Sequence, residues 1–392
     1  MENNYETVCL CALNSIFGYE PLVASALIEN LGSASAVFEM SDADKDAVFG
    51  PYSKYRGKIV KKELDAAEAV LQRLRRDGTV FVGITSDEYP KRLKGCEDAP
   101  LGIFVRSDSP VERIFAGTEH YVAVVGTREI TPYGEQWCRD IVRTLAGSGA
   151  APCIVSGLAY GTDIIAHRTA VECGLPTIAV MATGTDTVYP GRHRGFAEHL
   201  AGLPGCALVT DYPPGTAPVA LNFIRRNRII AGLSDSVILV ESAVKGGGMI
   251  TGRLAFSYNR SVYALPGRGD DSRSQGCNHL IREGVAEIID SLDGLNVQLG
   301  LCEKGRGCGG MQGCCRIVRG DLTERYSRTL PEDKIAAMAA VLLKVRERRG
   351  IDFDGLCDAT GLPYRSVAEV AALLENDGMI SVDLLRRCSI RG

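Results

Sequence analysis

Glycine-rich segments follow several short apolar runs in the middle of this chain. Residues 126–128 (GTR) follow YVAVV, and residues 156–163 (SGLAYGTD) follow CIV. Residues 183–194 (TGTDTVYPGRHR) and residues 245–248 (KGGG) have the same character. Glycine lets backbone N–H groups approach an anion closely, and a helix N-terminus adds partial positive charge. One such loop is often only a tight turn, but four in one region predict a site for phosphate groups.

Arginine side chains accompany these loops and sharpen the prediction. Arg128 directly follows an apolar run, and Arg192 and Arg194 lie in the third loop. Residues 223–228 (FIRRNR) place three guanidinium groups and an amide ahead of another apolar run. A guanidinium group binds phosphate oxygens in a bidentate geometry, and an aromatic such as Phe223 can stack on an unpaired base. A charged run is more often a solvated helix face, yet this combination favours a nucleic-acid backbone as the ligand.

The elements that position these loops are predicted to be parallel strands. Nine short apolar runs alternate with helical patterns, and the inner ones are continuously apolar, as in strands covered on both faces. This pattern predicts an α/β fold with an extended Rossmann-like, doubly wound, mostly parallel sheet, in which ligands bind beyond the carboxyl ends of the strands. The predicted strands are 80–84, 103–107, 121–126, 153–157, 177–184, 207–211, 236–242, 261–267 and 286–289.

The regions on either side of these strands have a different texture. Residues 1–78 show helical spacing broken by glycines, which predicts a small helical domain of helix-hairpin-helix or sterile-alpha-motif type that contacts DNA or protein. Residues 299–328 are rich in Gly and Cys and predict a linker between residues 79–298 and the last region. Residues 329–392 show three helical patterns and a terminal hairpin, which predict a winged-helix domain.

Composition limits the class of protein and the form of the site. The chain is 45% hydrophobic and 23% charged, as in an ordinary globular protein, and its net charge is −4. Residues 121–290 contain fifteen Lys or Arg and fifteen Asp or Glu, so a nucleic-acid site must be a local patch. No apolar run reaches the roughly 18 residues that span a bilayer. With no signal-peptide pattern and fourteen scattered cysteines, we expect a cytoplasmic protein with free thiols.

Signatures of enzymatic nucleotide chemistry are missing. No G-x-G-x-x-G follows the first central strand, and no G-x-x-x-x-G-K-[ST] occurs, so neither a dinucleotide cofactor nor P-loop hydrolysis is predicted. Asp163 and His167 are interpreted as a helix cap and a packed histidine, and Glu241 at a strand end is interpreted in the same structural sense. The cysteines of the linker lack paired C-x₂-C spacing, so no metal site is predicted there. These cysteines are Cys302, Cys308, Cys314 and Cys315.

Several segments taken together resemble a known protein family. They are GTREITPYG, IVSGLAYGTDIIAH, TIAVMATGTDTVYP, FIRRNRIIAGLSDSVILVES, GGGMITGRLA, YALPG and SQGCNHLIREGVAEII. In this order and spacing they closely resemble the DNA-processing protein A family (DprA, also called Smf), and the resemblance is dense over residues 85–290. The resemblance implies a non-enzymatic protein without a cofactor that protects incoming single-stranded DNA and loads the RecA recombinase in natural transformation and recombination. It also implies a homodimer.

The resemblance implies that Arg128 is the principal phosphate ligand and that the other loops line the same positively charged pocket. The predicted single-stranded DNA site comprises Gly126, Thr127, Arg128, Gly157, Arg192, Arg194, Phe223, Arg226, Asn227, Arg228, Lys245, Gly247 and Thr251. Three departures affect individual contacts. Gly191 stands at a position that is often basic in the family, so Arg192 or Arg194 must supply the charge. Ile224 replaces a usual proline, and residues 246–248 (GGG) replace Ser-Gly-Ser.

Two alternatives remain open from the sequence. A nucleotide phosphoribohydrolase of the lysine-decarboxylase-like group has a similar Rossmann variant, although the P-G-G-x-G-T-x-x-E signature of that group is missing here. In the other alternative the winged helix is the main binder of duplex DNA and the central domain is a scaffold. Its predicted recognition segment, residues 363–378, contains one arginine but three acidic residues, which suits a phosphate-rich groove poorly.

Overall fold

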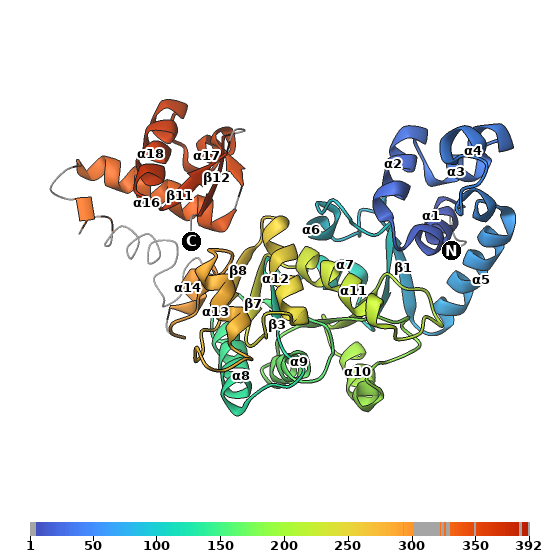
Figure 1. Cartoon of the computed structure of the whole chain (residues 1–392), viewed down its shortest axis with the longest axis horizontal. Coiled ribbons are helices and arrows are strands. Elements are labelled where there is room, and N and C mark those ends of the chain that lie inside the picture. Colours follow the sequence, from blue (N-terminus) through green and yellow to red (C-terminus); the bar gives the residue numbers. More distant parts are fainter. Residues whose placement is uncertain are drawn as a thin grey trace.

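A nine-stranded sheet forms the centre of the part of the chain that the structure describes (Figure 1). The computed structural model describes residues 5–292, 294–301, 322, 325–326, 330–348, 350–383 and 386–390. The strands are β1 (Thr79–Gly83), β2 (Gly102–Arg106), β3 (Tyr121–Val125), β4 (Cys153–Ser156), β5 (Thr177–Val180), β6 (Ala207–Thr210), β7 (Ser236–Leu239), β8 (Ser261–Ala264) and β9 (Glu287–Ile288). Each strand coincides with a predicted apolar run, so the predicted α/β fold with a mostly parallel sheet is confirmed.

The strand order creates a crevice beside β3. The order is β1-β2-β6-β5-β4-β3-β7-β8-β9, and every pair from β6 to β9 is parallel. Strands β4 to β6 extend to one side of β3, and β7 to β9 extend to the other. The chain that follows β3 therefore crosses toward β4, and the chain that follows β7 crosses the other way toward β8. The loops after β3 and β7 separate at the carboxyl ends of these two neighbouring strands. Ligands of doubly wound sheets bind at this kind of switch point.

Helices cover both faces of the sheet (Figure 1). One face carries α6 (Lys91–Lys94), α7 (Val111–Ala116), α11 (Ala220–Leu233), α12 (Gly247–Ser257) and α13 (Gln275–Arg282). The other carries α8 (Pro132–Ala146), α9 (Thr162–Glu172), α10 (Arg194–Ala201) and α14 (Leu295–Gln298). Along β3, Ala123 and Val125 are buried in the first layer, and Val122 and Val124 are buried in the second. Burial on both faces explains why the central strands are continuously apolar.

The N-terminal helices pack on the antiparallel end of this sheet. They are α1 (Tyr5–Phe17), α2 (Pro21–Leu31), α3 (Ala34–Glu39), α4 (Asp42–Phe49) and α5 (Lys61–Arg76). Helix α1 is buried on almost all sides, and its core includes Phe81 of β1 and Phe104 of β2. The buried Asn14 donates a 2.8 Å hydrogen bond to the carbonyl of Asp211 after β6. The helical N-terminal region and the sheet therefore share a hydrophobic core.

The C-terminal residues form helices and short strands in the predicted order. They are α16 (Glu332–Glu347), β10 (Ile351–Asp352), α17 (Phe353–Thr360), α18 (Tyr364–Asn376), β11 (Ile380–Val382) and β12 (Arg387–Ile390). Strand β12 pairs antiparallel with both β10 and β11. The winged-helix assignment and the four domain boundaries remain predictions. The cysteines at 302, 308, 314 and 315 lie outside the described residues, which contain no metal-binding cluster of three His, Cys, Asp or Glu side chains. None of the described helices is long and apolar enough to cross a membrane.

Histidine 167 is packed inside the central domain. Its side chain on α9 is fully buried, and its Nδ1 lies 2.7 Å from the Thr177 hydroxyl at the start of β5. That hydroxyl donates to the Ile154 carbonyl, so it accepts from the protonated Nδ1 of a neutral imidazole. Burial, assisted by the positive charge of Arg226, lowers the pKa of His167 to about 3. These contacts agree with the interpretation of a packed histidine.

We predict that acid destabilises the central domain through His167. Its pKa is about 6.5 in the unfolded chain and about 3 in the fold, so below pH 6.5 the unfolded state binds a proton first. This contribution to stability is complete above pH 6.5 and decreases on acidification, by about 2 kcal/mol at pH 5. Urea unfolding followed by Trp137, the single tryptophan, reports on this domain. His167→Asn should remove that part of the pH dependence, and an unchanged dependence would contradict the assignment.

Candidate functional site

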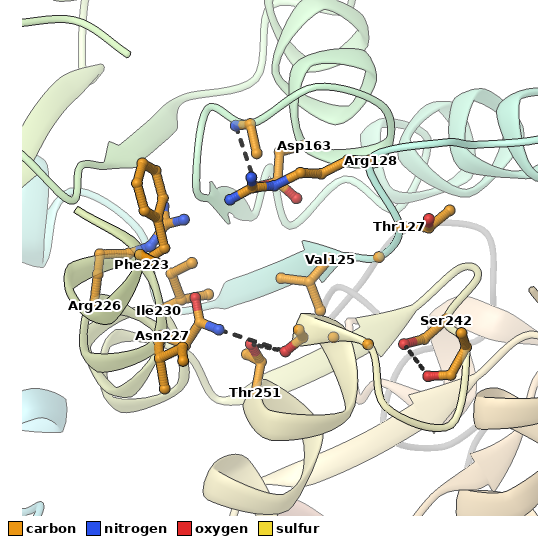
Figure 2. Close-up of a pocket in the computed structure, with 18 of the residues that line it drawn as sticks. Val125, Thr127, Arg128, Asp163, Phe223, Arg226, Asn227, Ile230, Ser242 and Thr251 are labelled. Carbon is orange, nitrogen blue, oxygen red and sulfur yellow. Dashed lines mark hydrogen bonds between the residues drawn. The ribbon is translucent and has the colours of Figure 1, made fainter. Parts of the chain in front are cut away.

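A cavity of about 540 Å³ opens at the crevice, between the loops after β3 and β7 and helix α11 (Figure 2). Eight of the thirteen predicted site residues line it: Gly126, Thr127, Arg128, Phe223, Arg226, Asn227, Gly247 and Thr251. The cavity has two kinds of wall. One is polar and comes from the two loops and α12, with Thr127, Ser242 and Thr251. The other is largely apolar and comes from the start of α11, with Phe223 and Ile224 beside Tyr189.

The loop that carries Arg128 is held at both ends by Glu241. The backbone carbonyl of Glu241 accepts from the amide of Thr127 at 2.7 Å. Its buried carboxylate accepts from the amide and the hydroxyl of Thr131 at 2.9 and 2.5 Å. The Thr131 hydroxyl in turn accepts from the Gly134 amide and caps α8. Glu241 thus holds the loop at Thr127 and at Thr131, and Arg128 lies between these two anchor points.

The next loop packs closely against the first. Gly161 has φ +73°, and a Cβ atom there would lie 2.3 Å from the Thr127 carbonyl oxygen. A side chain at this position would be strained and would also displace the loop of Arg128. Glycine at position 161 therefore allows its loop to pack closely against the loop that carries Arg128.

Arginine 226 forms the floor of the cavity. Its side chain is 3% exposed, its Nη1 donates to the carbonyl of Val180 at the end of β5, and its Nε has no hydrogen-bond partner in the structure as described. A Cβ atom on Gly157 would lie 2.0 Å from that Nη1, so the glycine leaves the space that the guanidinium fills. Burial lowers the pKa of Arg226 to about 10, an effect that the nearby Asp163 opposes. The guanidinium is therefore charged at neutral pH.

Aspartate 163 supports this floor from the start of α9. Its Oδ2 accepts from the amides of Gly157 and Ala159 at 3.1 and 3.4 Å. Burial raises the pKa of its carboxyl group, while the charge of Arg226 and the backbone amides lower it. Arg226 and Asp163 thus lie close enough for each to shift the pKa of the other, and the exposed Arg128 adds a positive charge at the mouth.

Aromatic rings line the mouth beside Arg128. The guanidinium carbon of Arg128 lies 5.0 Å from the ring centre of Phe223, within the range of a cation–π contact. The Phe223 ring lies 5.3 Å from that of Tyr189 in an edge-on arrangement, and the Tyr189 side chain is 45% exposed. On α12, Thr251 and Asn227 of α11 both donate to the Gly247 carbonyl at 3.4 Å. A charged group, two aromatic faces and a helix N-terminus therefore meet at one opening.

Five predicted residues do not line this cavity. Gly157 lies beneath it against Arg226. Arg228 is buried on another face of α11, where it forms a 2.7 Å ion pair with Asp211 and donates to the Asp98 carbonyl. The remaining three residues, Arg192, Arg194 and Lys245, have exposed side chains outside the lining.

Helical periodicity explains why these predicted residues point in different directions. Residues 220–233 are one continuous helix, so Phe223, Asn227 and Ile230 share a face, and Arg226 lies beside them. The prediction treated residues 223–228 as one cluster and did not take this helix into account. The interpretation of Asp163 as a helix cap is wrong, because α9 has Gly161 as its N-cap with no side-chain cap, and Asp163 instead accepts from amides of the preceding loop. The specific role of Glu241 was missed, although a buried acid at the end of an apolar strand is a signal that could have indicated it.

Comparisons with known proteins identify relatives of the central part of this chain. Residues 80–300 match a family described as DNA recombination-mediator protein A. Protein Smf of Escherichia coli (strain K12) is 39% identical over 235 residues, which cover 60% of this chain and 61% of that protein. Protein Smf of Synechocystis sp. is 36% identical over 287 residues, which cover 71% of this chain and 70% of that protein. The matched region is thus about three-fifths of the length of the first relative.

Two solved structures share the fold. The X-ray structure of DNA processing protein A from Streptococcus pneumoniae has a TM-score of 0.59 at 27% identity and covers 75% of this chain and 97% of that one. DNA processing protein A from Helicobacter pylori, described for its single-stranded DNA binding mode, has a TM-score of 0.50 at 30% identity. It covers 57% of this chain and 97% of that one. These matches do not favour the phosphoribohydrolase alternative.

We predict that Gly157→Ala destabilises the central domain by about 1–3 kcal/mol, because the new methyl group overlaps the buried guanidinium of Arg226. Gly191→Ala is a matched control, since no atom lies within 4 Å of a Cβ atom at that position. Both changes reduce the flexibility of the unfolded chain to a similar extent. Urea unfolding followed by Trp137 fluorescence compares them. Equal stability of the two variants would show that Arg226 is free to move.

Proposed function

The chain belongs to the DNA recombination-mediator protein A family, and from this premise we propose that it binds single-stranded DNA in the cavity between β3, β7 and α11. One observation carries the proposal: an exposed arginine, a buried charged arginine and glycine-rich backbone meet a wall of exposed aromatic and apolar side chains. Single-stranded DNA has the matching chemistry, with phosphates along its backbone and unpaired base faces beside them. Binding is the whole role of this site, and no covalent step is assigned to it.

The phosphate contacts are assigned first to Arg128 and the loops beside it. Arg128 is exposed at the mouth and is held by the Glu241 anchors, so its guanidinium can bind a phosphate in bidentate geometry. Helix α12 begins at Gly247, and residues 246–248 line the cavity, which directs the positive end of an 11-residue helix toward the bound anion. Arg226 contributes its charge from the floor. Gly126, Thr127, Gly157, Phe223, Asn227 and Thr251 complete the proposed site.

We assign three exposed cations outside the cavity lining to an outer part of the proposed site. Arg192, Arg194 and Lys245 are exposed, and their charges attract a strand before it enters the cavity. Arg228 was predicted as a ligand as well, and in the fold its charge is matched by Asp211. We therefore assign it a supporting role, through the packing of α11.

The cellular role that we propose is protection of incoming DNA and delivery of the strand to the RecA recombinase, in natural transformation and recombination. The description of the family as a recombination mediator and the names of the two matched structures support the DNA-processing part of this role. We further propose that the protein acts as a homodimer in the cytoplasm. The ten cysteines in the described part of the chain are free, which fits a reducing compartment.

We predict that Arg128→Ala lowers the affinity for oligo(dT) at least about 10-fold, because it removes a charge-assisted phosphate contact. The wild-type affinity should be nanomolar to micromolar, and the slope of log K against log salt should decrease by about one on substitution. Mobility-shift titrations at several salt concentrations measure both quantities. Arg143→Ala is the control, since Arg143 pairs with Asp140 near the other end of α8. Unchanged binding by the Arg128 variant would refute the assigned site.

We also predict that removal of residues 329–392 leaves the affinity for oligo(dT) unchanged within about twofold. Helix α18 carries Arg365 with Glu369 and Glu375, a poor composition for contacts with phosphate. Full-length and shortened proteins are compared in the same titrations. A loss of single-strand binding in the shortened protein would transfer the main site to the C-terminal region.

A further inference from the structure

An apolar ridge lies beside the cavity at the start of α11. Residues 217–221 (APVAL) are all exposed, and Val219 and Leu221 are exposed by 48% and 50%. Ile224, one turn further along the helix, is 48% exposed. We call these six residues the α11 ridge. Consecutive exposed apolar side chains are unusual on a soluble protein surface and indicate a contact surface.

Helix α11 separates the ridge from its polar contacts. Asn222 and Arg225 face the N-terminal helices: the Tyr19 hydroxyl donates to Asn222 Oδ1 at 3.0 Å, and Arg225 Nη1 donates to the Tyr19 carbonyl at 2.8 Å. The Arg225 guanidinium also lies 4.2 Å from the centre of the Tyr19 ring. These contacts hold the first turns of α11 in place. The ridge is therefore a fixed surface and its exposure is a property of the folded chain.

The ridge is continuous with the cavity. Pro218, Ala220 and Ile224 belong to the ridge and also line the cavity, as do residues 246–248 of the glycine-rich loop. A strand whose phosphates lie against the glycine-rich loops therefore has its bases directed toward the ridge. The side chains of the ridge are aliphatic and carry no hydrogen-bond donor or acceptor, so they can contact base faces but cannot distinguish base edges.

We propose that the α11 ridge binds the unstacked bases of the same DNA strand whose phosphates occupy the cavity. This inference rests on the proposed function. It adds an assignment of the phosphates to one wall of the cavity and of the bases to the other. The aromatic pair at the mouth receives the base nearest Arg128, and the ridge continues that apolar surface along α11. Contacts of this type depend on the presence of a base and not on its identity.

The test compares oligo(dT) with an abasic oligonucleotide of the same length and charge. The wild-type protein should bind oligo(dT) more tightly. Leu221→Ser with Ile224→Ser should weaken oligo(dT) binding about 5- to 10-fold, the loss expected when apolar contacts with one base are removed, and leave abasic binding unchanged. Arg128→Ala should weaken both. Val48→Ser on α4, where the valine is 50% exposed, is the control for removing a surface aliphatic group and should change neither.

A second variant tests the ridge by gain of binding. Ile224→Tyr adds an aromatic face at an exposed position and should increase the preference for oligo(dT) over the abasic strand about 3-fold or more. The inference is overturned if the Ser variant weakens both oligonucleotides equally or neither. It is also overturned if that variant alters the oligomeric state in sedimentation while oligo(dT) binding is unchanged, which would identify the ridge as a protein contact. If the wild-type protein binds neither strand, the proposed function fails.

Discussion

The buried charge of Arg226 is the interaction on which the site depends. A guanidinium group without water is costly, and here the Val180 carbonyl accepts from Nη1 while the nearby Asp163 favours the charged form. Asp163 is itself oriented by the amide of Gly157, which stands where any side chain would displace the guanidinium. This arrangement connects the ends of β4 and β5 with α9 and α11. It fixes the helix that brings Phe223 and Asn227 to the cavity.

Much of the fold could be predicted from the sequence because parallel strands that are buried on both faces appear as continuous apolar runs. All nine strands were indicated by short apolar runs, and the gathering of their loops at one edge follows from parallel order. The directions of individual side chains were harder to predict, because they depend on the residue at which a helix begins. Helix α11 begins at Ala220, and this start sends Arg226 to the cavity and Arg228 to Asp211. The six adjacent residues 223–228, which the prediction treated as one cluster, are thus divided among different faces of the helix.

Contacts between distant segments could not be obtained from local patterns at all. Glu241 and Thr131 are 110 positions apart, and the sequence around either residue does not identify the other as its hydrogen-bond partner. The same is true of Tyr19, which meets Asn222 across 203 positions. Charge counts were equally uninformative, since the central region is neutral overall. The positive character of the site arises from where Arg128 and Arg226 are placed and from a helix terminus, not from an excess of basic residues.

The core shared by α1 with β1 and β2 bears on how this architecture can vary in evolution. Phe81 and Phe104 face the N-terminal helices, and Tyr19 holds the first turn of α11. Exchange of the helical region for an unrelated module would therefore require a new complementary surface on the sheet and a new partner for Asn222. The change of sequence texture near residue 78 marks a change of secondary structure. In this chain, the helices and the sheet bury one common set of side chains.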